Sequence, residues 1–558
     1  MAKALRPVII FLLALSVVLP LIWVVLGALQ ASSSLAGWMS LSRSPALFKS
    51  LGLSVWTGVT STLLSYWFSK WLISRFFVGR GFQTSLHKLS MRLAPMLAIP
   101  HAAFAIGLVF LLSPSGWLIR LASPWLTGFE YPPALETTQD PYGIGLIFAL
   151  VVKETPFLLW NAVTQLGRDD VQKRLQREFA LAQTLEYKPT QAFRKVVWPQ
   201  LANRMLWPLL AVFAYGLTVV DMAIIIGPAR PPTLAVLSWQ LLQDIDKNSN
   251  DQGATAALLL ALHLLFFVGA MAVWKKFDVF KNTRIDGCRG RVNQSSLPKG
   301  SSKAFAGRLV TNTLILLYGT VMLLLAISSI SGVWSFPSML PQSYTLAAWS
   351  SVWQSSTVIW TTLSLALASS ALVMLWSVTW LELAPASWDV ALRKLLYLPL
   401  LMPSVLWVIG LHNISLTLGV DATWLGLLLA HSLAVLPFVI ITLSPAYLDF
   451  DVRYALLSRS LGRSNGYFLI RVKWPLLRAS LVSGFAVGFA VSVAQYLPTL
   501  YIGAGRFATV TTEAVTLGSG GQRSLTAAYA WLQFLLPVLC FAIAAWIGRS
   551  RKFRMTST

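Results

Sequence analysis

The chain has 558 residues, of which 56% are hydrophobic and only 11% are charged. Because the apolar residues occur in long runs, this composition excludes a soluble globular protein and indicates a polytopic α-helical membrane protein. The formal net charge of +24 would suggest nucleic-acid binding if the chain were soluble, but in a membrane protein the placement of the basic residues explains it better.

About twelve apolar segments are each close to the ~20 residues that a helix needs to cross the hydrocarbon core. We therefore predict an all-α fold of about twelve transmembrane helices. The first segment follows Lys3 and Arg6 as a signal peptide would, but it exceeds the roughly 7–15 residues of a signal core, so we expect a retained span. In chain order, the predicted spans cover residues 7–29, 51–73, 94–113, 143–161, 205–227, 253–274, 309–333, 356–381, 395–418, 422–443, 481–503 and 524–547.

Lysine and arginine are concentrated in alternate loops. The loops after the fourth and tenth predicted spans are rich in them, whereas the opposite loops carry acidic residues such as Glu130, Asp244 and Asp251. With an even number of spans, this positive-inside bias predicts that both termini are cytoplasmic. The basic residues of the two loops include Lys173, Arg174, Arg177, Lys188, Arg194, Lys195, Arg453, Arg459, Arg463, Arg471 and Lys473.

The two halves of the chain repeat one another. In the third span of each half, a proline precedes a glycine by seven residues, at Pro100 and Gly107 and again at Pro403 and Gly410. We therefore predict two parallel six-span halves, residues 1–274 and 309–558, related by an axis along the membrane normal. The stretch 275–308 between them is predicted to be a basic cytoplasmic linker. The fourth spans match as well, through Gly145, Ala149 and Pro156 in one half and Gly426, Ala430 and Pro437 in the other.

A polar segment occurs twice, after the fourth span of each half. The first copy reads Ala-Leu-Ala-Gln-Thr-Leu-Glu at residues 180–186 and continues to Trp198-Pro199. The second reads Leu-Leu-Ser-Arg-Ser-Leu-Gly at 456–462 and continues to Trp474-Pro475. In both copies a leucine, Leu185 or Leu461, lies fourteen residues before the proline.

Local sequence predicts two short helices in each copy. Residues 171–186 form an amphipathic pattern with Val171, Leu175, Phe179, Ala182 and Leu185 on one stripe. Pro189 suits the first position of a second helix ending near Trp198, while Gly462 suits a left-handed helix end and Ser464 or Asn465 the following cap. Such paired loops fit a groove on another protein; the alternative is a connector that lies on the membrane surface.

This repeated segment resembles the EAA loop of bacterial ABC importer permeases, which couples the membrane subunit to a cytoplasmic ATPase. The family glutamate falls at Ala180 and Leu456, and the family glycine is kept at Gly462 but replaced by Glu186. The stretches 99–107 and 490–498 resemble the YnjC-like branch of the fused twelve-span permeases most. The resemblance implies coupling loops at 171–201 and 452–477, with coupling positions Ala180, Leu185, Glu186, Pro189, Pro199, Leu456, Leu461, Gly462 and Pro475.

The resemblance implies a permease subunit of the bacterial inner (plasma) membrane, with two copies of an ABC ATPase and a periplasmic solute-binding protein as partners. Membrane lipid is expected as a further partner, and nucleic acid is not expected as one. The chain has no Gly-x-x-x-x-Gly-Lys-Ser/Thr phosphate loop, so ATP and Mg²⁺ are expected on the partner subunits. No catalytic residue and no cofactor are expected in this chain. The alternative is an ion-coupled secondary transporter with six plus six spans, which would not require the paired loops.

Ionisable groups inside spans are costly and often functional. Asp221 lies deep in the fifth span and Gln495 is its repeat partner, so we predict that they face each other across a pathway for a polar solute such as a cation. Lys153 and Glu154 are further candidates. The alternative role for Asp221 and Gln495 is a helix–helix hydrogen bond. The lone histidines His101, His263 and His431 are expected to be packed and hydrogen-bonded, and no metal site is predicted.

Overall fold

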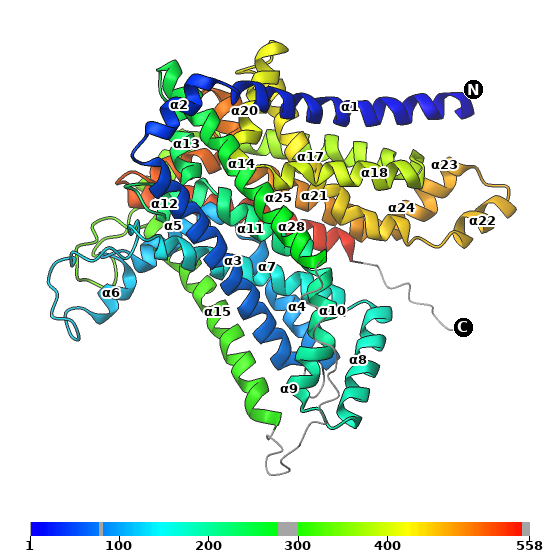
Figure 1. Cartoon of the computed structure of the whole chain (residues 1–558), viewed down its shortest axis with the longest axis horizontal. Coiled ribbons are helices and arrows are strands. Elements are labelled where there is room, and N and C mark those ends of the chain that lie inside the picture. Colours follow the sequence, from blue (N-terminus) through cyan, green and yellow to red (C-terminus); the bar gives the residue numbers. More distant parts are fainter. Residues whose placement is uncertain (1, 78–81, 277–299, 550–558) are drawn as a thin grey trace. The chain divides into compact units, whose positions relative to one another are not determined.

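The computed structural model describes residues 2–77, 82–276 and 300–549 (Figure 1). This described part is built of helices, with one isolated β-bridge between Ser331 and Tyr344. The predicted all-α fold is confirmed. Most of the predicted linker, residues 277–299, lies outside the described residues.

The chain forms two compact units that differ from its two sequential halves. One unit comprises Met1–Ala31, Leu346–Met402 and Trp407–Thr558, and we call it unit 1. Unit 2 comprises Ser32–Thr345 and Pro403–Leu406. The first helix of the chain therefore belongs to the unit built mainly from the second half. Conversely, the first helix of the second half belongs to unit 2.

The repeated glycine of the third span explains how these two exchanged helices pack. In unit 2, a Cβ atom on Gly107 would lie 2.6 Å from a side-chain atom of Val321 in α15 (Gly300–Ser329). In unit 1, a Cβ atom on Gly410 would lie 2.1 Å from the carbonyl oxygen of Val24 in α1 (Ala2–Ala31). Small residues let membrane helices approach closely, so each glycine receives the first helix of the other half.

In unit 2, α3 packs against α7 and α11 along a stripe of small polar residues. Ser50, Ser54, Ser61 and Ser65 of α3 are almost fully buried, and Gly58 meets the backbone of Leu217. The helices of this unit are α2 (Leu35–Arg43), α3 (Leu47–Phe77), α4 (Phe82–Ala98), α5 (His101–Leu112), α6 (Trp117–Ala122), α7 (Ile144–Leu166), α8 (Asp169–Thr184), α9 (Pro189–Ala192), η1 (Phe193–Val197), α10 (Trp198–Arg204), α11 (Leu206–Thr218), α12 (Asp221–Ile226), α13 (Leu234–Leu242), α14 (Lys247–Lys276) and α15.

In unit 1, α17, α21 and α25 pack together around Ala366, Phe489 and Val493. The helices of this unit, besides α1, are α16 (Ala347–Gln354), α17 (Ser356–Leu383), α18 (Ala386–Leu396), α19 (Leu398–Leu401), α20 (Ser404–Thr417), α21 (Trp424–Leu448), α22 (Arg453–Ser460), α23 (Asn465–Phe468), η2 (Leu469–Lys473), α24 (Trp474–Leu476), α25 (Arg478–Val493), α26 (Leu497–Gly503), α27 (Val510–Gly518) and α28 (Arg523–Gly548). The first residues of α20 group with unit 2.

The described residues contain 8 helices long and apolar enough to cross a membrane, or up to 10 if two bent pairs each count as one span. These overlap ten of the twelve predicted spans. The other two differ for physical reasons. The predicted span 51–73 lies in α3, where the buried serines and threonines lower the hydropathy. The predicted span 205–227 is interrupted at residues 219–220 and forms the shorter helices α11 and α12.

Candidate functional site

The first predicted coupling loop consists of two helical segments separated by a left-handed turn. Its first helix, α8, covers Asp169–Thr184, and Glu186 follows with a φ of 64°. Pro189 is the first residue of the second segment, as predicted. This segment is longer than predicted, because it continues from α9 through η1 and α10 to Arg204 instead of ending near Trp198.

The second coupling loop repeats this order. The helix α22 ends at Ser460, and Gly462 follows with a φ of 68°. Of the two residues expected to cap the next helix, Ser464 does so, because its side chain accepts a hydrogen bond of 3.2 Å from the backbone N–H of Tyr467. The chain then continues through α23, η2 and α24 to Leu476.

The same hydrogen bond closes the first helix of both loops. The N–H of Tyr187 donates to the carbonyl of Ala182 at 3.1 Å, and the N–H of Arg463 donates to the carbonyl of Ser458 at 3.1 Å. This is the 6→1 hydrogen bond of the Schellman motif, which accompanies a left-handed residue at the C-terminus of a helix. Glycine adopts that conformation without steric cost, so Gly462 suits it and Glu186 adopts it against its preference. The departure from glycine changes the side chain and not the backbone.

A five-residue π-helical segment ends directly before each Trp-Pro pair. The N–H of Trp198 donates to the carbonyl of Phe193, and the N–H of Trp474 donates to the carbonyl of Leu469. Proline lacks the N–H that would bond the carbonyl four residues earlier, which perturbs the α-helical pattern at the same place in both copies. Such π-segments are rare and occur frequently at functional sites. The sequence showed that the two prolines correspond, but we did not predict the π-segments from it. The prolines were the signal that could have revealed them, because each lacks the N–H of a regular α-helix.

Aromatic side chains fasten the first loop to α3. The ring of Phe77 lies with its centroid 5.2 Å from that of Phe179 and 5.5 Å from that of Phe193. The indole N–H of Trp198 donates to the hydroxyl of Tyr66 at 2.9 Å. Both helical segments of the loop therefore contact the same membrane helix.

The second loop is fastened through its own tryptophan to α21 and through a lysine to α17. The indole N–H of Trp474 donates to the hydroxyl of Tyr447 in α21 at 2.8 Å. The Lys473 ammonium lies 2.8 Å from the carboxylate of Glu382 near the end of α17 and 4.4 Å from the centre of the Tyr447 ring. The two loops therefore share a backbone, and each contacts the second span of its own half, α3 or α17. They differ in the partner of the tryptophan, which lies in α3 for the first loop and in α21 for the second.

The predicted coupling positions are mostly exposed. Val171 and Leu175 of the amphipathic stripe are buried, each with 1% exposure, but Leu185 was assigned to that stripe and is 63% exposed. Leu456 and Leu461 of the second copy are 58% and 69% exposed. Exposed apolar residues gathered on a basic loop are a feature of interaction surfaces. Ala180, Glu186, Gly462 and Pro475 are also exposed, and Pro189 and Pro199 are half-buried.

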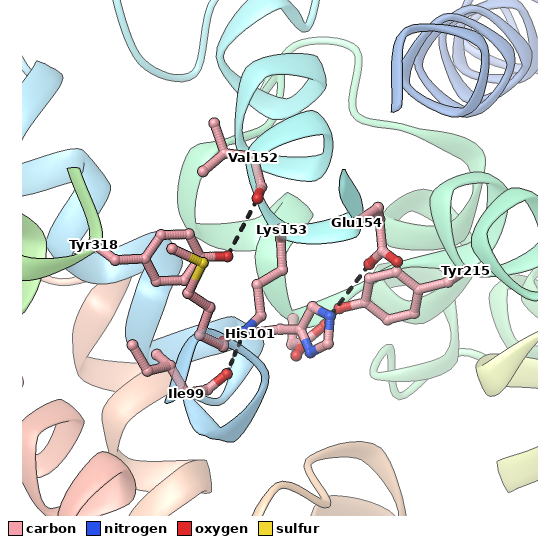
Figure 2. A network of polar contacts seen from close by, with 9 residues as sticks. Ile99, His101, Val152, Lys153, Glu154, Tyr215 and Tyr318 are labelled. Atoms are coloured by element: carbon pink, nitrogen blue, oxygen red, sulfur yellow. Dashed lines mark hydrogen bonds and ion pairs between the residues drawn. The ribbon is translucent and has the colours of Figure 1, made fainter. Parts of the chain in front are cut away.

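Unit 2 also contains a polar cluster within its membrane helices (Figure 2). Lys153 of α7 is 4% exposed, and its ammonium donates to the carbonyl of Met96 at 3.0 Å and to the carbonyl of Ile99. The same ammonium lies 5.7 Å from the ring centre of Tyr318 in α15. Lys153 is thus occupied by backbone oxygens and an aromatic ring.

The neighbouring Glu154 begins a chain of contacts that ends at Asp221. The Glu154 carboxylate lies 3.3 Å from Nε2 of His101, whose ring centroid is 4.7 Å from that of Tyr215. The Tyr215 hydroxyl donates to the Asp221 carboxylate at 3.4 Å. The structure therefore brings two predicted pathway residues, Glu154 and Asp221, into one cluster. Sequence reasoning treated His101 as a packed histidine and did not single out Tyr215, because no local pattern links residues on separate helices.

Gln495 occupies in unit 1 the position that Asp221 occupies in unit 2. Asp221 starts α12 directly after the break in the fifth span, and Gln495 lies in the break between α25 and α26. Both are half-buried, and the Gln495 side-chain amide donates to the carbonyl of Val491 at 3.1 Å. Because the two residues belong to different units, their meeting across a pathway stays a prediction.

Of the other two histidines, His431 is packed and hydrogen-bonded as expected, whereas His263 is half-buried and bonds within its own helix. His431 is 1% exposed, and its ring nitrogens lie 2.8 Å from the hydroxyl of Ser492 and 2.9 Å from that of Thr499. His263 contacts the carbonyl of Leu259 at 2.8 Å. Within the described ranges, no group of three or more His, Cys, Asp or Glu side chains is placed to hold a metal ion.

Comparison with known proteins relates this architecture to transport. No family model matches the chain. It is 33% identical to the inner membrane ABC transporter permease protein YnjC of Escherichia coli (strain K12), over 99% of each chain. It is 23% identical to the thiamine transport system permease protein ThiP of the same organism, over 91% of this chain and 89% of that protein.

A shorter match reaches the spermidine/putrescine permease protein PotC of Haemophilus influenzae, at 22% identity over 28% of this chain and 62% of that protein. Full-length similarity to an ABC permease decides against the ion-coupled alternative. It also supports a multi-pass location in the inner membrane, in agreement with the apolar helices. The chain belongs to the family of ABC importer permeases and is a membrane-spanning subunit of that kind.

Proposed function

We propose that two copies of a cytoplasmic ABC ATPase drive this permease through its two coupling loops, residues 171–201 and 452–477. One observation carries the proposal, namely the repetition of the same loop backbone in both halves. A left-handed turn at Glu186 or Gly462 is followed in each case by a π-segment and a Trp-Pro pair. A passive surface connector has no need to repeat these unusual features, whereas a dimeric partner presents two equivalent grooves.

The surface chemistry of the loops supports a protein partner. Leu185 and Leu461 at the turns are exposed, as are basic residues such as Arg459 and Arg463. In this proposal ATP and Mg²⁺ are bound by the ATPase subunits, and a periplasmic solute-binding protein delivers the solute. Both chain termini are then cytoplasmic, on the side of the coupling loops.

Replacing the two exposed leucines tests this docking. We expect Leu185→Asp and Leu461→Asp together to reduce recovery of a co-purifying ABC ATPase by at least about tenfold, because an apolar anchor at an interface is worth about 2 kcal/mol or more. The measurement is quantitative mass spectrometry of the tagged chain purified from its native membranes. The control is Leu126→Asp, at an 86% exposed position outside both loops. Unchanged ATPase recovery in the double variant would refute the docking role.

For the solute, we propose a polar cation that passes Asp221 and Gln495, with Lys153 and Glu154 beside the same route. The chain of contacts from Glu154 to Asp221 places two carboxylates in one cluster, and Lys153 is held by backbone carbonyls. Carboxylates in a low-dielectric setting favour a cationic ligand. The names of two relatives point the same way, since thiamine and the polyamines spermidine and putrescine are cations.

Uptake by cells tests this route. We expect Asp221→Asn to lower uptake of the transported cation about tenfold or more, because an uncharged amide loses the charge-assisted interaction of the carboxylate. The probes are radiolabelled thiamine, spermidine and putrescine, measured in cells that express the chain with its ATPase and its solute-binding protein. Gln495→Glu is the complementary change and should retain uptake. Normal uptake and normal assembly of Asp221→Asn would contradict the proposed pathway.

A further inference from the structure

The third span of the first half is interrupted between α4 and α5 by Pro100. A helical carbonyl normally accepts from the N–H four residues later, and for Met96 that residue is Pro100, which has no N–H. The proline therefore leaves the Met96 carbonyl without its helical donor inside the protein. A buried carbonyl in this state is costly unless another donor reaches it.

Lys153 supplies that donor from a different helix. Its ammonium bonds the carbonyl of Met96 at 3.0 Å and the carbonyl of Ile99, so it caps the end of α4. The rings of Phe104 and Tyr318, at 6.0 and 5.7 Å, surround the same charge. A cation at a helix C-terminus is favoured by the helix dipole, and aromatic faces add to the stabilisation of a desolvated ammonium.

Glu154 holds the other side of the same break. It follows Lys153 directly on α7, and adjacent residues of a helix project in different directions. Its carboxylate contacts His101, which is the first residue of α5. The pair therefore places a cation at the end of α4 and an anion beside the start of α5, which is the charge order that the dipoles of the two helices favour.

The second half has the same proline without these charges. The match of Gly145 and Pro156 to Gly426 and Pro437 places Ala434 and Val435 at the positions of the pair. There the helices on either side of the break, Ala386–Leu401 and Ser404–Thr417, meet at 109°. The charged pair is thus a property of one half, in the unit that also contains Asp221.

We propose that Lys153 and Glu154 are positioning residues that clamp the α4–α5 break and thereby hold His101, Tyr215 and Asp221 in place for transport. This rests on the proposed pathway and assigns the pair a role that acts through the backbone and His101. Each charge stabilises one helix end, the cation at the end of α4 and the anion at the start of α5. The clamp therefore depends on which of the two positions carries which charge, and not only on the presence of both charges. Arginine at position 153 preserves the cation and its donors, whereas reversing the pair presents the wrong charge to each helix end.

Hydrogen exchange of peptides that cover residues 93–106 tests the clamp in the full chain, reconstituted in lipid nanodiscs. We expect Lys153→Ala and Glu154→Gln to speed exchange there about tenfold or more, as loss of a charged hydrogen bond predicts. Lys153→Arg should restore slow exchange. The double variant Lys153→Glu with Glu154→Lys keeps both charges but exchanges their positions, so residues 93–106 should exchange fast in it. His431→Phe, which removes a buried hydrogen-bonded histidine of unit 1, is the matched control and should leave residues 93–106 slow.

Two results would overturn the clamp. One is slow exchange at 93–106 in both single variants, and the other is an equal increase in every protected peptide, which indicates general destabilisation. Glu154→Gln changes volume little and carries the test if Lys153→Ala fails to assemble. The uptake assay separates the two proposals: if Asp221→Asn transports normally while exchange at 93–106 responds as expected, the pathway fails and the local clamp stands. If uptake depends on Asp221 but exchange does not respond, the clamp alone fails.

Discussion

Residues 186 and 462 have the same left-handed backbone in the two coupling loops but carry glutamate and glycine. At Gly462 no heavy atom lies within 4 Å of the place where a Cβ would sit, so only the conformation opposes a side chain there. Glu186 adopts a φ of 64° without the freedom of glycine. The first loop therefore retains a small conformational strain that the second loop lacks.

Exchanging the residue types isolates this strain. We expect Glu186→Gly to stabilise the first turn by about 1 kcal/mol and Gly462→Ala to destabilise the second by a similar amount. Local hydrogen exchange of residues 182–190 and 458–466 measures both. A slower exchange in Glu186→Gly and a faster one in Gly462→Ala are expected, and the opposite signs would show that the turns depend on side-chain contacts.

At the scale of elements, two glycines decide where helices cross. Gly107 of α5 meets Val321 of α15, and Gly410 of α20 meets Val24 of α1. The sequence repeat showed that these glycines correspond, and the structure shows why, since each accommodates a helix from the opposite half. No periodicity within α5 or α20 specifies that partner, because the contact joins residues more than 200 positions apart.

A methyl group at these positions should disturb the crossing. We expect Gly410→Ala to destabilise unit 1 by about 1–3 kcal/mol, because its Cβ would collide with a backbone carbonyl that moves only with the helix. Gly107→Ala should cost less, since a side-chain atom of Val321 is the nearest neighbour. Gly319→Ala on α15 is the control, because nothing lies within 4 Å of its Cβ position. Thermal unfolding in lipid nanodiscs measures the relative stability of the three variants. Equal stability of Gly410→Ala and Gly319→Ala would contradict the prediction.

At the scale of the whole molecule, each compact unit takes one helix from the other half of the sequence. Leu21 and Val24 of α1 are fully buried within a unit otherwise formed by residues beyond 345. Likewise, Tyr318 and Val321 of α15 are buried in unit 2. In a membrane such packing depends on close helix contacts, since lipid already surrounds apolar side chains.

Dividing the chain tests this exchange. We expect fragments 1–274 and 309–558 to be degraded when each is expressed alone, because each lacks one helix of its unit and carries one without its partner. Co-expression should restore both fragments and yield a complex that purifies through a tag on either. Stable accumulation of a single fragment, measured by immunoblot of isolated membranes, would show that the exchanged helix is dispensable.

The sequence alone determined the features that depend on short stretches of chain. Long apolar runs required membrane helices, and Pro189 marked the start of a helix. Gly462 marked the end of one helix and Ser464 the start of the next. These effects are predictable because they act within a few residues. The repeat likewise predicted paired loops, but the left-handed backbone that Glu186 shares with Gly462 came from the structure. The interrupted helix α11–α12 was missed, because a continuous apolar run gives no warning of a break that tertiary contacts impose.

Only the tertiary structure decided which distant groups meet. Lys153 caps a carbonyl 57 residues away, Glu154 joins His101, and α1 packs with the second half of the chain. The need for a donor at Met96 is readable from Pro100, but the residue that satisfies it is not. Local backbone geometry determines which polar groups lack a hydrogen-bond partner. The packing of whole helices determines which side chain supplies that partner, and this packing is a property of the complete fold.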